Sequence, residues 1–184
     1  MQVKYSYLES QFDDVEDFID DLRGLVVSGE FTLGPFVEGF ERKFADYIGV
    51  KHVVGTNTGT GAIILALKSV GVSPGSEVIT VANTFIATAG AIIACGATPV
   101  FVDCDERYQI DIDKIERVIN DKTSAIIPVH WAGASPDMNA IVKIANDYRI
   151  PIVEDACPAV GATINDRFAG TFGKANAFSM HPLK

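Results

Sequence analysis

The spacing of hydrophobic positions changes after about residue 50 of the chain. Before that point apolar residues recur every three or four positions, as in amphipathic helices. Residues 8–29 are predicted as one helix, with a loop over residues 29–35 and a second helix that stops at Gly49. The apolar face of the first helix comprises Phe12, Val15, Phe18, Ile19 and Leu22, and that of the second comprises Phe36, Phe40, Phe44, Tyr47 and Ile48.

From residue 52 onward, short and almost continuously apolar runs alternate with segments of helical spacing. The pattern predicts strands over residues 52–55, 77–81, 99–103, 125–130, 151–154 and 175–180, and helices over residues 61–70, 85–95, 113–120 and 137–148. Strands separated by helices of roughly ten residues form a parallel sheet that is covered on both faces. The predicted fold class is therefore α/β, with a helical segment and loop in residues 1–50 and a three-layer α/β/α sheet domain in residues 51–184. Asn165-Asp166 predicts a hairpin turn.

Composition narrows the classes of partner. The chain has 184 residues, which suffice for one domain with a substantial core, and its net charge of −9 argues against nucleic acid or an anionic membrane surface as the main partner. No uncharged apolar run reaches the ~18 residues of a membrane span, and no secretory signal precedes residue 18. We therefore expect a cytoplasmic protein. Its three cysteines lack metal-ligand spacing, which predicts buried, reduced thiols and no metal site.

A glycine-rich turn opens the predicted helix that begins near residue 61. Gly59 and Gly61 would let backbone amides approach an anion, the helix N-terminus favours negative charge, and Thr60 adds a hydroxyl. The spacing matches neither a dinucleotide-binding fingerprint nor a P-loop. An ordinary helix cap would use the same residues, so a phosphate site and a plain cap both remain open.

Other polar and aromatic residues follow predicted strands, and open α/β sheets bind ligands beyond the carboxyl ends of their strands. Asp155 ends one strand, where a buried carboxylate needs a cation or hydrogen bonds, either structural or from a ligand. Phe85 starts a helix and would pack in the core or stack on a heterocycle. Ser179 and Lys184 follow the last strand, where a lysine alone is usually a surface residue. His130 more often has a structural than a catalytic role in such a position.

Together these residues resemble the sugar aminotransferase family called DegT/DnrJ/EryC1/StrS, of aspartate aminotransferase fold type I. The resemblance runs from about Ser28 to Lys184, and its specificity comes from the order and spacing of motifs that are weak singly. The motifs are the loop Ser28-Gly29-Glu30-Phe31-Thr32-Leu33-Gly34-Pro35, the helix Phe40-Glu41 through Gly49, the turn Thr58-Gly59-Thr60-Gly61-Ala62-Ile63, and Thr84-Phe85-Ile86-Ala87-Thr88. Pro128-Val129-His130-x-x-Gly133, Glu154-Asp155-Ala156 and Phe178-Ser179-x-His181-Pro182-x-Lys184 complete the series.

The resemblance implies a pyridoxal 5'-phosphate site and a role for each matching residue. Lys184 is similar to the catalytic lysine that forms the Schiff base, and Asp155 to the partner of the pyridinium nitrogen. The phosphate contacts match Gly59, Thr60, the amide of Gly61, and Ser179, and the ring-stacking aromatic matches Phe85.

Two positions depart from the family pattern. Pro158 stands where the family usually has a glutamine that touches the phenolic oxygen of the cofactor. We expect His130 to take over that contact, ahead of an Asn or Thr near residues 57–58 or 83–84 or a water. Gly61 replaces the usual alanine, which should leave its amide available. Lys184 itself argues against the dehydratase branch of the family, which has histidine there.

The resemblance implies transfer of an amino group, from glutamate, to a nucleotide-linked keto-sugar, as in amino sugar and polysaccharide biosynthesis. It also implies a homodimer with active sites shared across the interface. The alternatives are another fold-type-I enzyme, such as a lyase or decarboxylase, and a non-catalytic domain that binds phosphate or a nucleotide. Because family members are about twice as long, the large domain is expected to be incomplete here and the C-terminal small domain absent. The chain would then be either a gene fragment or a sequence cut at a modified lysine.

Overall fold

The computed structural model describes residues 8–11 and 14–184 and divides into two compact units. One comprises Met1–Gly55 with His181–Leu183, and the other comprises Thr56–Met180 with Lys184. No helix within the described residues is long and apolar enough to cross a membrane. Those residues also contain no group of three His, Cys, Asp or Glu side chains that could hold a metal ion.

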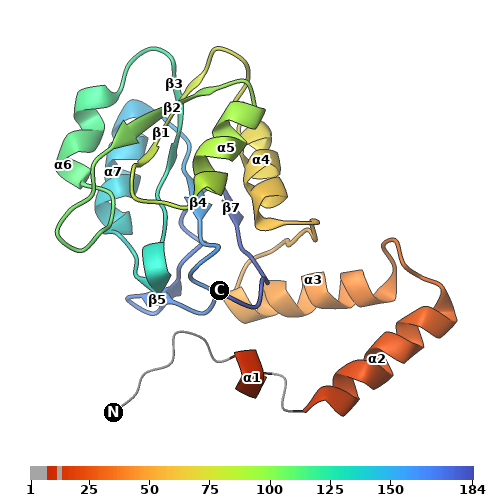
Figure 1. Cartoon of the computed structure of the whole chain (residues 1–184). Coiled ribbons are helices and arrows are strands. Elements are labelled where there is room, and N and C mark those ends of the chain that lie inside the picture. Colours follow the sequence, from red (N-terminus) through yellow and green to blue (C-terminus); the bar gives the residue numbers. More distant parts are fainter. Residues whose placement is uncertain (1–7, 12–13) are drawn as a thin grey trace, which may run out of the picture. The chain divides into compact units, whose positions relative to one another are not determined.

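Helices dominate the unit that contains the N-terminal residues (Figure 1): α1 (Leu8–Gln11), α2 (Val15–Ser28) and α3 (Pro35–Ile48). The single helix predicted over residues 8–29 is thus observed as two, and Phe12 lies outside the described residues. Glycines in left-handed conformation end α2 and α3, because Gly29 (φ 71°) and Gly49 (φ 72°) accept a backbone geometry that costs other residues energy. The predicted stop at Gly49 is confirmed.

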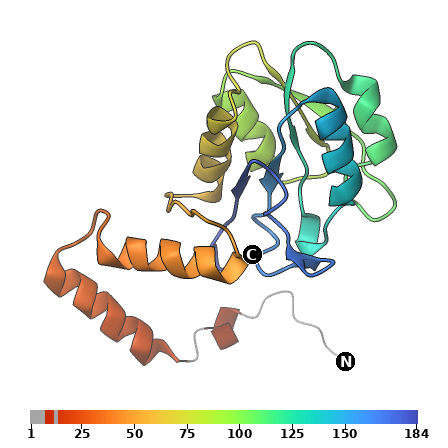
Figure 2. The same cartoon turned by 180° about the vertical axis from the view of Figure 1, so that it is seen from behind.

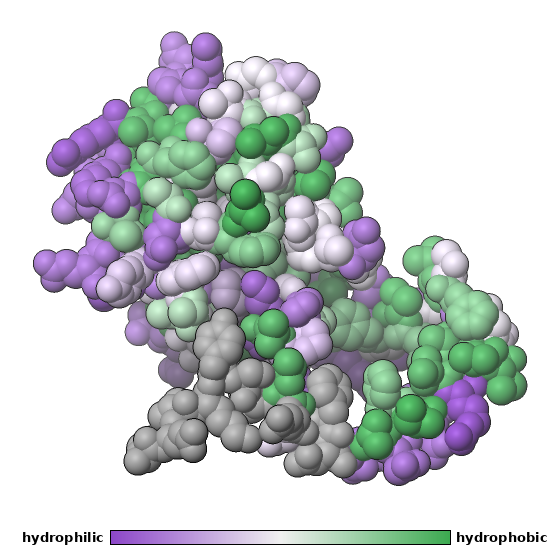
Figure 3. All heavy atoms as spheres, viewed as in Figure 1, coloured by the Kyte–Doolittle hydropathy of each residue, from purple (hydrophilic) through white to green (hydrophobic). Residues whose placement is uncertain are grey.

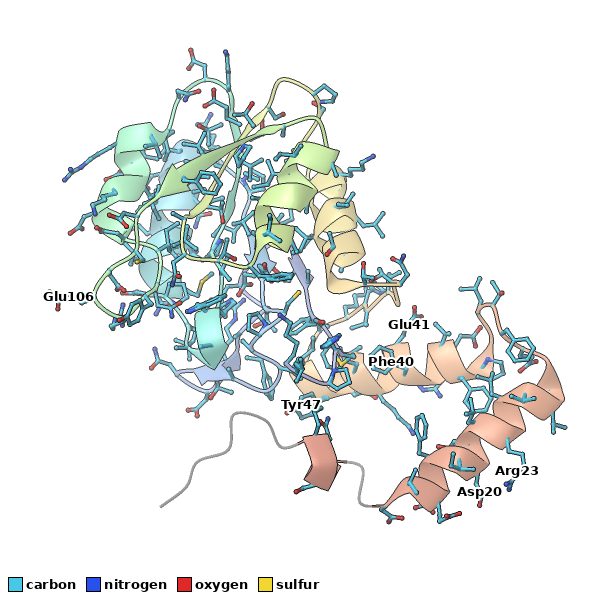
Figure 4. The ribbon with its side chains drawn as sticks, viewed as in Figure 1. Asp20, Arg23, Phe40, Glu41, Tyr47 and Glu106 are labelled. Atoms are coloured by element: carbon cyan, nitrogen blue, oxygen red, sulfur yellow. The ribbon has the colours of Figure 1, made fainter. Side chains whose placement is uncertain are left out.

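The helix α2 has an apolar face that no described residue covers. None of its residues is buried, although Val15, Phe18, Ile19, Leu22, Val26 and Val27 are large and apolar. Figure 3 shows hydrophobic side chains gathered over α2 and over the segment that follows it. The polar side of the helix carries the exposed ion pair between Asp20 and Arg23, 2.6 Å apart (Figure 4).

The second unit is built on parallel strands. These are β1 (Glu77–Val81), β2 (Thr98–Val102), β3 (Thr123–Ile127), β4 (Val153–Asp155) and β7 (Ala175–Ala177). Strand β1 pairs with β2 and β3, and β4 pairs with β7, all in parallel. Parallel bridges from Ile126 to Ile152 and from Val129 to Asp155 join β3 to β4. The spatial order is therefore β2-β1-β3-β4-β7, so the carboxyl ends of the strands lie along one edge.

Helices cover both faces of this sheet, as Figures 1 and 2 show from opposite sides. On one face lie α4 (Gly59–Ser69) and α5 (Ile86–Ala94), and on the other lie α6 (Ile112–Ile115) and α7 (Met138–Tyr148). The core between the layers is aliphatic and includes Ile63, Leu67, Ile79, Ile92, Ile126, Ile127, Met138 and Ile141. The predicted three-layer α/β/α fold is confirmed. The hairpin predicted at Asn165-Asp166 is also present, between β5 (Thr163–Ile164) and β6 (Arg167–Phe168).

Some predicted elements are wrong or too long. Residues 52–55 form no strand, because a strand needs a hydrogen-bonded neighbour and none of the described residues provides one. The amide of Gly55 donates instead to Oε1 of Glu41 in the same unit, at 2.6 Å. The strand predicted over residues 175–180 ends at Ala177, where its pairing with β4 ends. The helix predicted over residues 113–120 consists of the short α6 and a 3₁₀ turn, η1 (Glu116–Val118).

Candidate functional site

The N-terminus of α4 carries the glycine-rich turn. Thr58 caps the helix, with its Oγ1 accepting the amide hydrogen of Gly61 at 3.0 Å. The expectation that the Gly61 amide is available is therefore wrong, because the cap already uses it. The amides of Gly59 and Thr60 begin the helix and have no acceptor inside it. These two amides and the Thr60 hydroxyl are the groups that the turn can offer to an anion.

Gly59 sits against the segment that follows β7. A β-carbon at this position would lie 3.0 Å from Sγ of Cys157, 3.3 Å from Cβ of Ser179 and 3.5 Å from its Oγ. A side chain at position 59 would thus force neighbouring atoms to move. The structure brings Ser179 next to the start of α4, although 120 positions separate it from Gly59 in the sequence.

Asp155 ends β4 with a buried carboxylate that is 5% exposed. Its Oδ2 accepts a hydrogen bond from Oγ1 of Thr88 at 2.7 Å, and its Oδ1 accepts one from the amide of Cys157 at 3.2 Å. A carboxylate offers about four lone-pair sites, so these donors occupy only part of its capacity. Among the described residues, Asp155 belongs to no ion pair. The carboxylate can therefore accept a further, charged donor.

Phe85 and Lys184 lie together. The Nζ atom of Lys184 is 5.3 Å from the centroid of the Phe85 ring, within the range of cation–π attraction. The Phe85 ring is 60% exposed and immediately precedes α5. One turn into that helix, Thr88 makes its hydrogen bond to Asp155 and shares another, 2.8 Å long, with the hydroxyl of Thr84. The start of α5 therefore connects the aromatic ring to the buried carboxylate.

Two residues of this region, Cys157 and Thr88, were missed in the sequence. The Cys157 thiol lies between Asp155 and Gly59, and burial, reinforced by the negative charge of Asp155, raises its pKa. The sequence signal for Cys157 was its position two residues after Asp155, the last residue of β4. Of the three cysteines, Cys95 and Cys157 are buried as expected, whereas Cys104 is partly exposed, and all three are free thiols.

The expectation that His130 faces the cofactor is wrong. Its imidazole is completely buried and both ring nitrogens are engaged, Nδ1 with Oγ of Ser135 at 2.8 Å and Nε2 with Oε2 of Glu154 at 2.9 Å. With no free nitrogen, this imidazole cannot contact a ligand oxygen. Pro158 cannot make that contact either, because proline has no hydrogen-bond donor in its side chain.

Comparison with known proteins assigns the family. Residues 13–184 match the model of the DegT/DnrJ/EryC1/StrS aminotransferase family, and the chain belongs to this family. It is 44% identical over 167 residues to the spore coat polysaccharide biosynthesis protein SpsC of Bacillus subtilis, a match that covers 90% of this chain and 43% of SpsC. It is 43% identical over 181 residues to dTDP-3-amino-3,4,6-trideoxy-alpha-D-glucose transaminase of Micromonospora megalomicea subsp. nigra, covering 98% of this chain and 48% of that protein.

A solved structure agrees with this assignment. The crystal structure of S. venezuelae DesV in complex with a ketimine intermediate superposes with a TM-score of 0.91 and 37% identity, covering 98% of this chain and 49% of DesV. The chain spans about half the length of the curated relatives it matches. The fold is that of the fold-type-I aminotransferases, whose cofactor is pyridoxal phosphate.

The residues present fit that cofactor. A protonated ring nitrogen is a charged donor of the kind that the partly satisfied carboxylate of Asp155 can accept. A phosphate fits the start of α4, where the amides of Gly59 and Thr60 lack helical acceptors. Phe85 offers an exposed aromatic face, and Lys184 brings a primary amine to it.

Proposed function

We propose that this protein binds pyridoxal 5'-phosphate and transfers an amino group, from glutamate, to a keto-sugar carried by a nucleotide. The observation that carries the proposal is the buried carboxylate of Asp155, which keeps acceptor capacity at the same sheet edge as the lysine–phenylalanine pair. The substrate class is supported by family membership and by the names of relatives, one of which is a dTDP-sugar transaminase.

In this proposal Asp155 keeps a proton on the ring nitrogen of the cofactor. A buried anion favours a positively charged neighbour, because the low local dielectric strengthens their attraction. The hydrogen bonds from Thr88 and Cys157 hold the carboxylate in one orientation and prevent it from turning away. The bound cofactor supplies an electron-poor ring that stabilises negative charge at the carbon of the amino donor.

Lys184 is the proposed catalytic residue. Its Nζ would hold the cofactor covalently and, once released, carry a proton to and from the reacting carbon as a general base and acid. The Phe85 ring, whose centroid lies 5.3 Å from Nζ, would orient that amine and stack on the flat ring of the cofactor. Gly59, Thr60 and Ser179 would hold the phosphate, with the helix dipole of α4 adding favourable charge. The amide of Gly61 contributes through the cap that fixes this turn.

The same proposal includes a second copy of the chain as partner, with each active site shared across the interface. The uncovered apolar face of α2 supports it, since monomeric soluble proteins rarely expose contiguous apolar patches of this kind. The working compartment in this proposal is the cytoplasm.

Amino transfer is tested with isotope-labelled donor. The complete natural protein, loaded with pyridoxal phosphate, is incubated with ¹⁵N-glutamate and a panel of nucleotide-linked keto-sugars, and the sugar products are analysed by mass spectrometry. The proposal requires that one sugar gain ¹⁵N while 2-oxoglutarate forms in equal amount. Decarboxylated or eliminated products, with no nitrogen transferred, would contradict it and favour another reaction of the same fold type.

A further inference from the structure

Glu154 is the second buried carboxylate of β4, and the proposed reaction gives it no task. It is completely buried and, because successive strand residues point to opposite faces, it projects away from the side of Asp155. Its Oε1 accepts hydrogen bonds from the amides of Phe172 and Gly173, both at 2.5 Å. Its Oε2 accepts bonds from the amide of Gly170 at 2.8 Å and from Nε2 of His130 at 2.9 Å.

These four donors fill the four lone-pair sites of the carboxylate. Glu154 therefore has no capacity left for a ligand, in contrast to Asp155, and its contribution must come from the groups it holds. Three of its four donors are backbone amides of residues 170–173, a segment without regular secondary structure between β6 and β7. The fourth comes from His130, which Ser135 fixes through Nδ1.

The segment held by Glu154 is tightly fitted on both sides. A β-carbon on Gly173 would overlap Oδ1 of Asn176 and lie 2.8 Å from the carbonyl oxygen of Ile152. A β-carbon on Gly170 would overlap Cζ of Phe178, and this glycine has a φ of 81°. Neither position has room for a side chain, so the segment packs closely between β4 and Phe178.

The chain directly after residue 173 carries part of the candidate site. Strand β7 pairs with β4, Phe178 packs on Gly170, and Ser179 lies against Gly59. Asp155 directly follows Glu154 on β4. A shift of residues 170–173 would therefore move Ser179 and Lys184 relative to Asp155. Two consecutive carboxylates thus differ: Asp155 keeps acceptor capacity, whereas the acceptor sites of Glu154 are filled by the chain itself.

We propose that Glu154 is a positioning residue whose carboxylate, held by His130, fixes residues 170–173 and so places Ser179 and Lys184 opposite Asp155. The inference rests on the proposed function for the role of Lys184, but the hydrogen-bonded hub formed by Glu154 stands independently of it. Glutamine has a similar shape but lacks the acceptor capacity of this residue. An amide has one oxygen and one NH₂, so in either orientation at least one of the three backbone amides would face the NH₂ group.

The test uses the complete natural protein loaded with pyridoxal phosphate and its Glu154→Gln variant. Residue-resolved hydrogen exchange should show the amides of Gly170, Phe172 and Gly173 exchanging at least about tenfold faster, equivalent to ~1.4 kcal/mol of local opening free energy. The rate at which borohydride fixes the pyridoxyl group on Lys184 should fall relative to the other lysines. Unchanged exchange at these three amides would overturn the proposal.

Two control variants separate positioning from general loss of stability. Glu77→Gln makes the same substitution at a carboxylate that accepts one hydrogen bond from Asn120. Ile141→Val weakens the aliphatic core on α7, typically by about 0.5–1.5 kcal/mol. Neither should accelerate exchange at residues 170–173 selectively or slow the labelling of Lys184. If Ile141→Val changed the exchange at residues 170–173 and the labelling of Lys184 as much as Glu154→Gln does, Glu154 would act only through general stability. That result would contradict the proposal.

The unmodified protein provides a measurement that does not depend on whether the variant folds. The amides of Gly170, Phe172 and Gly173 should exchange as slowly as those of β4, although their segment is neither helix nor strand. Exchange as fast as at an exposed loop residue such as Glu106, labelled in Figure 4, would contradict the hub. Labelling of a lysine other than Lys184 in the unmodified protein would instead contradict the catalytic role proposed for Lys184 and leave the hub intact.

Discussion

The hydroxyl of Thr88 donates a hydrogen bond to Oδ2 of Asp155 at 2.7 Å, connecting the start of α5 to the end of β4. Both residues are buried, and 67 positions separate them in the sequence. The bond fixes the carboxylate at the sheet edge. The remaining lone pairs of the carboxylate oxygens stay available for another donor. Placement of the proposed ring-nitrogen partner thus depends on a residue with no chemical role of its own.

Thr88→Val keeps the shape of the side chain and removes the donor. Because a buried acceptor would lose one of its two partners, we expect a loss of about 1–3 kcal/mol, divided between the free energy of unfolding and the affinity for pyridoxal phosphate. Chemical denaturation and cofactor titration measure the two parts. Thr88→Ser keeps the hydroxyl and is the matched control. Equal losses in Val and Ser variants would show that packing, not the hydrogen bond, is responsible.

Asp155→Asn tests the charge while preserving the shape. Loss of a charge-assisted hydrogen bond costs about 1.5–3 kcal/mol, so single-turnover proton transfer should slow by roughly one to two orders of magnitude. Cofactor affinity should change less than this rate, because the charge acts on the reacting state. Asp147→Asn, an exposed carboxylate on α7 that pairs with Lys143, is the control and should leave the rate unchanged. Unaltered single-turnover rates in Asp155→Asn would count against the assigned role.

Gly59→Ala tests the close approach at the start of α4. The new methyl group would meet Cys157 Sγ at 3.0 Å, so the helix start must separate from Ser179, and overpacking of this kind costs roughly 1–3 kcal/mol. We expect weaker binding of pyridoxal phosphate, measured by fluorescence titration. Gly90→Ala in α5 has nothing within 4 Å of its added carbon and serves as the control.

A double variant identifies the cause of that loss. Removing the thiol with Cys157→Ala should recover part of the affinity that Gly59→Ala loses, giving an interaction free energy of about 0.5 kcal/mol or more. Strictly additive effects would mean that the methyl group and the thiol do not meet.

The sequence predicted the overall sheet well because its signals are local. Buried parallel strands are short apolar runs, and strand ends of a parallel sheet necessarily share an edge, which places Asp155 and Ser179 there without further knowledge. Pairing is a different matter. Residues 52–55 have the composition of a strand, but a strand exists only with a partner, and composition does not tell whether one is present.

The supporting side chains could not be predicted from local pattern. Thr88, Cys157 and Glu154 owe their importance to contacts across 67, 98 and up to 24 sequence positions, respectively. His130 shows the opposite error, because its place after a strand suggested an open crevice. The neighbouring Glu154 instead draws the imidazole into the core on the other face. The side chain of a residue at a strand end can turn to either face of the sheet. The choice depends on the hydrogen-bond partners that distant parts of the chain place on each face.

The position of the covalent cofactor bond is the decisive observation for the proposed site. The complete natural protein is mixed with pyridoxal phosphate, reduced with borohydride and digested, and mass spectrometry locates the pyridoxyl group. We predict that the label lies on Lys184, and that Lys184→Ala loses both the label and amino transfer while retaining some non-covalent cofactor binding. A label that is carried by another lysine, or that persists in Lys184→Ala, would contradict the assignment of Lys184.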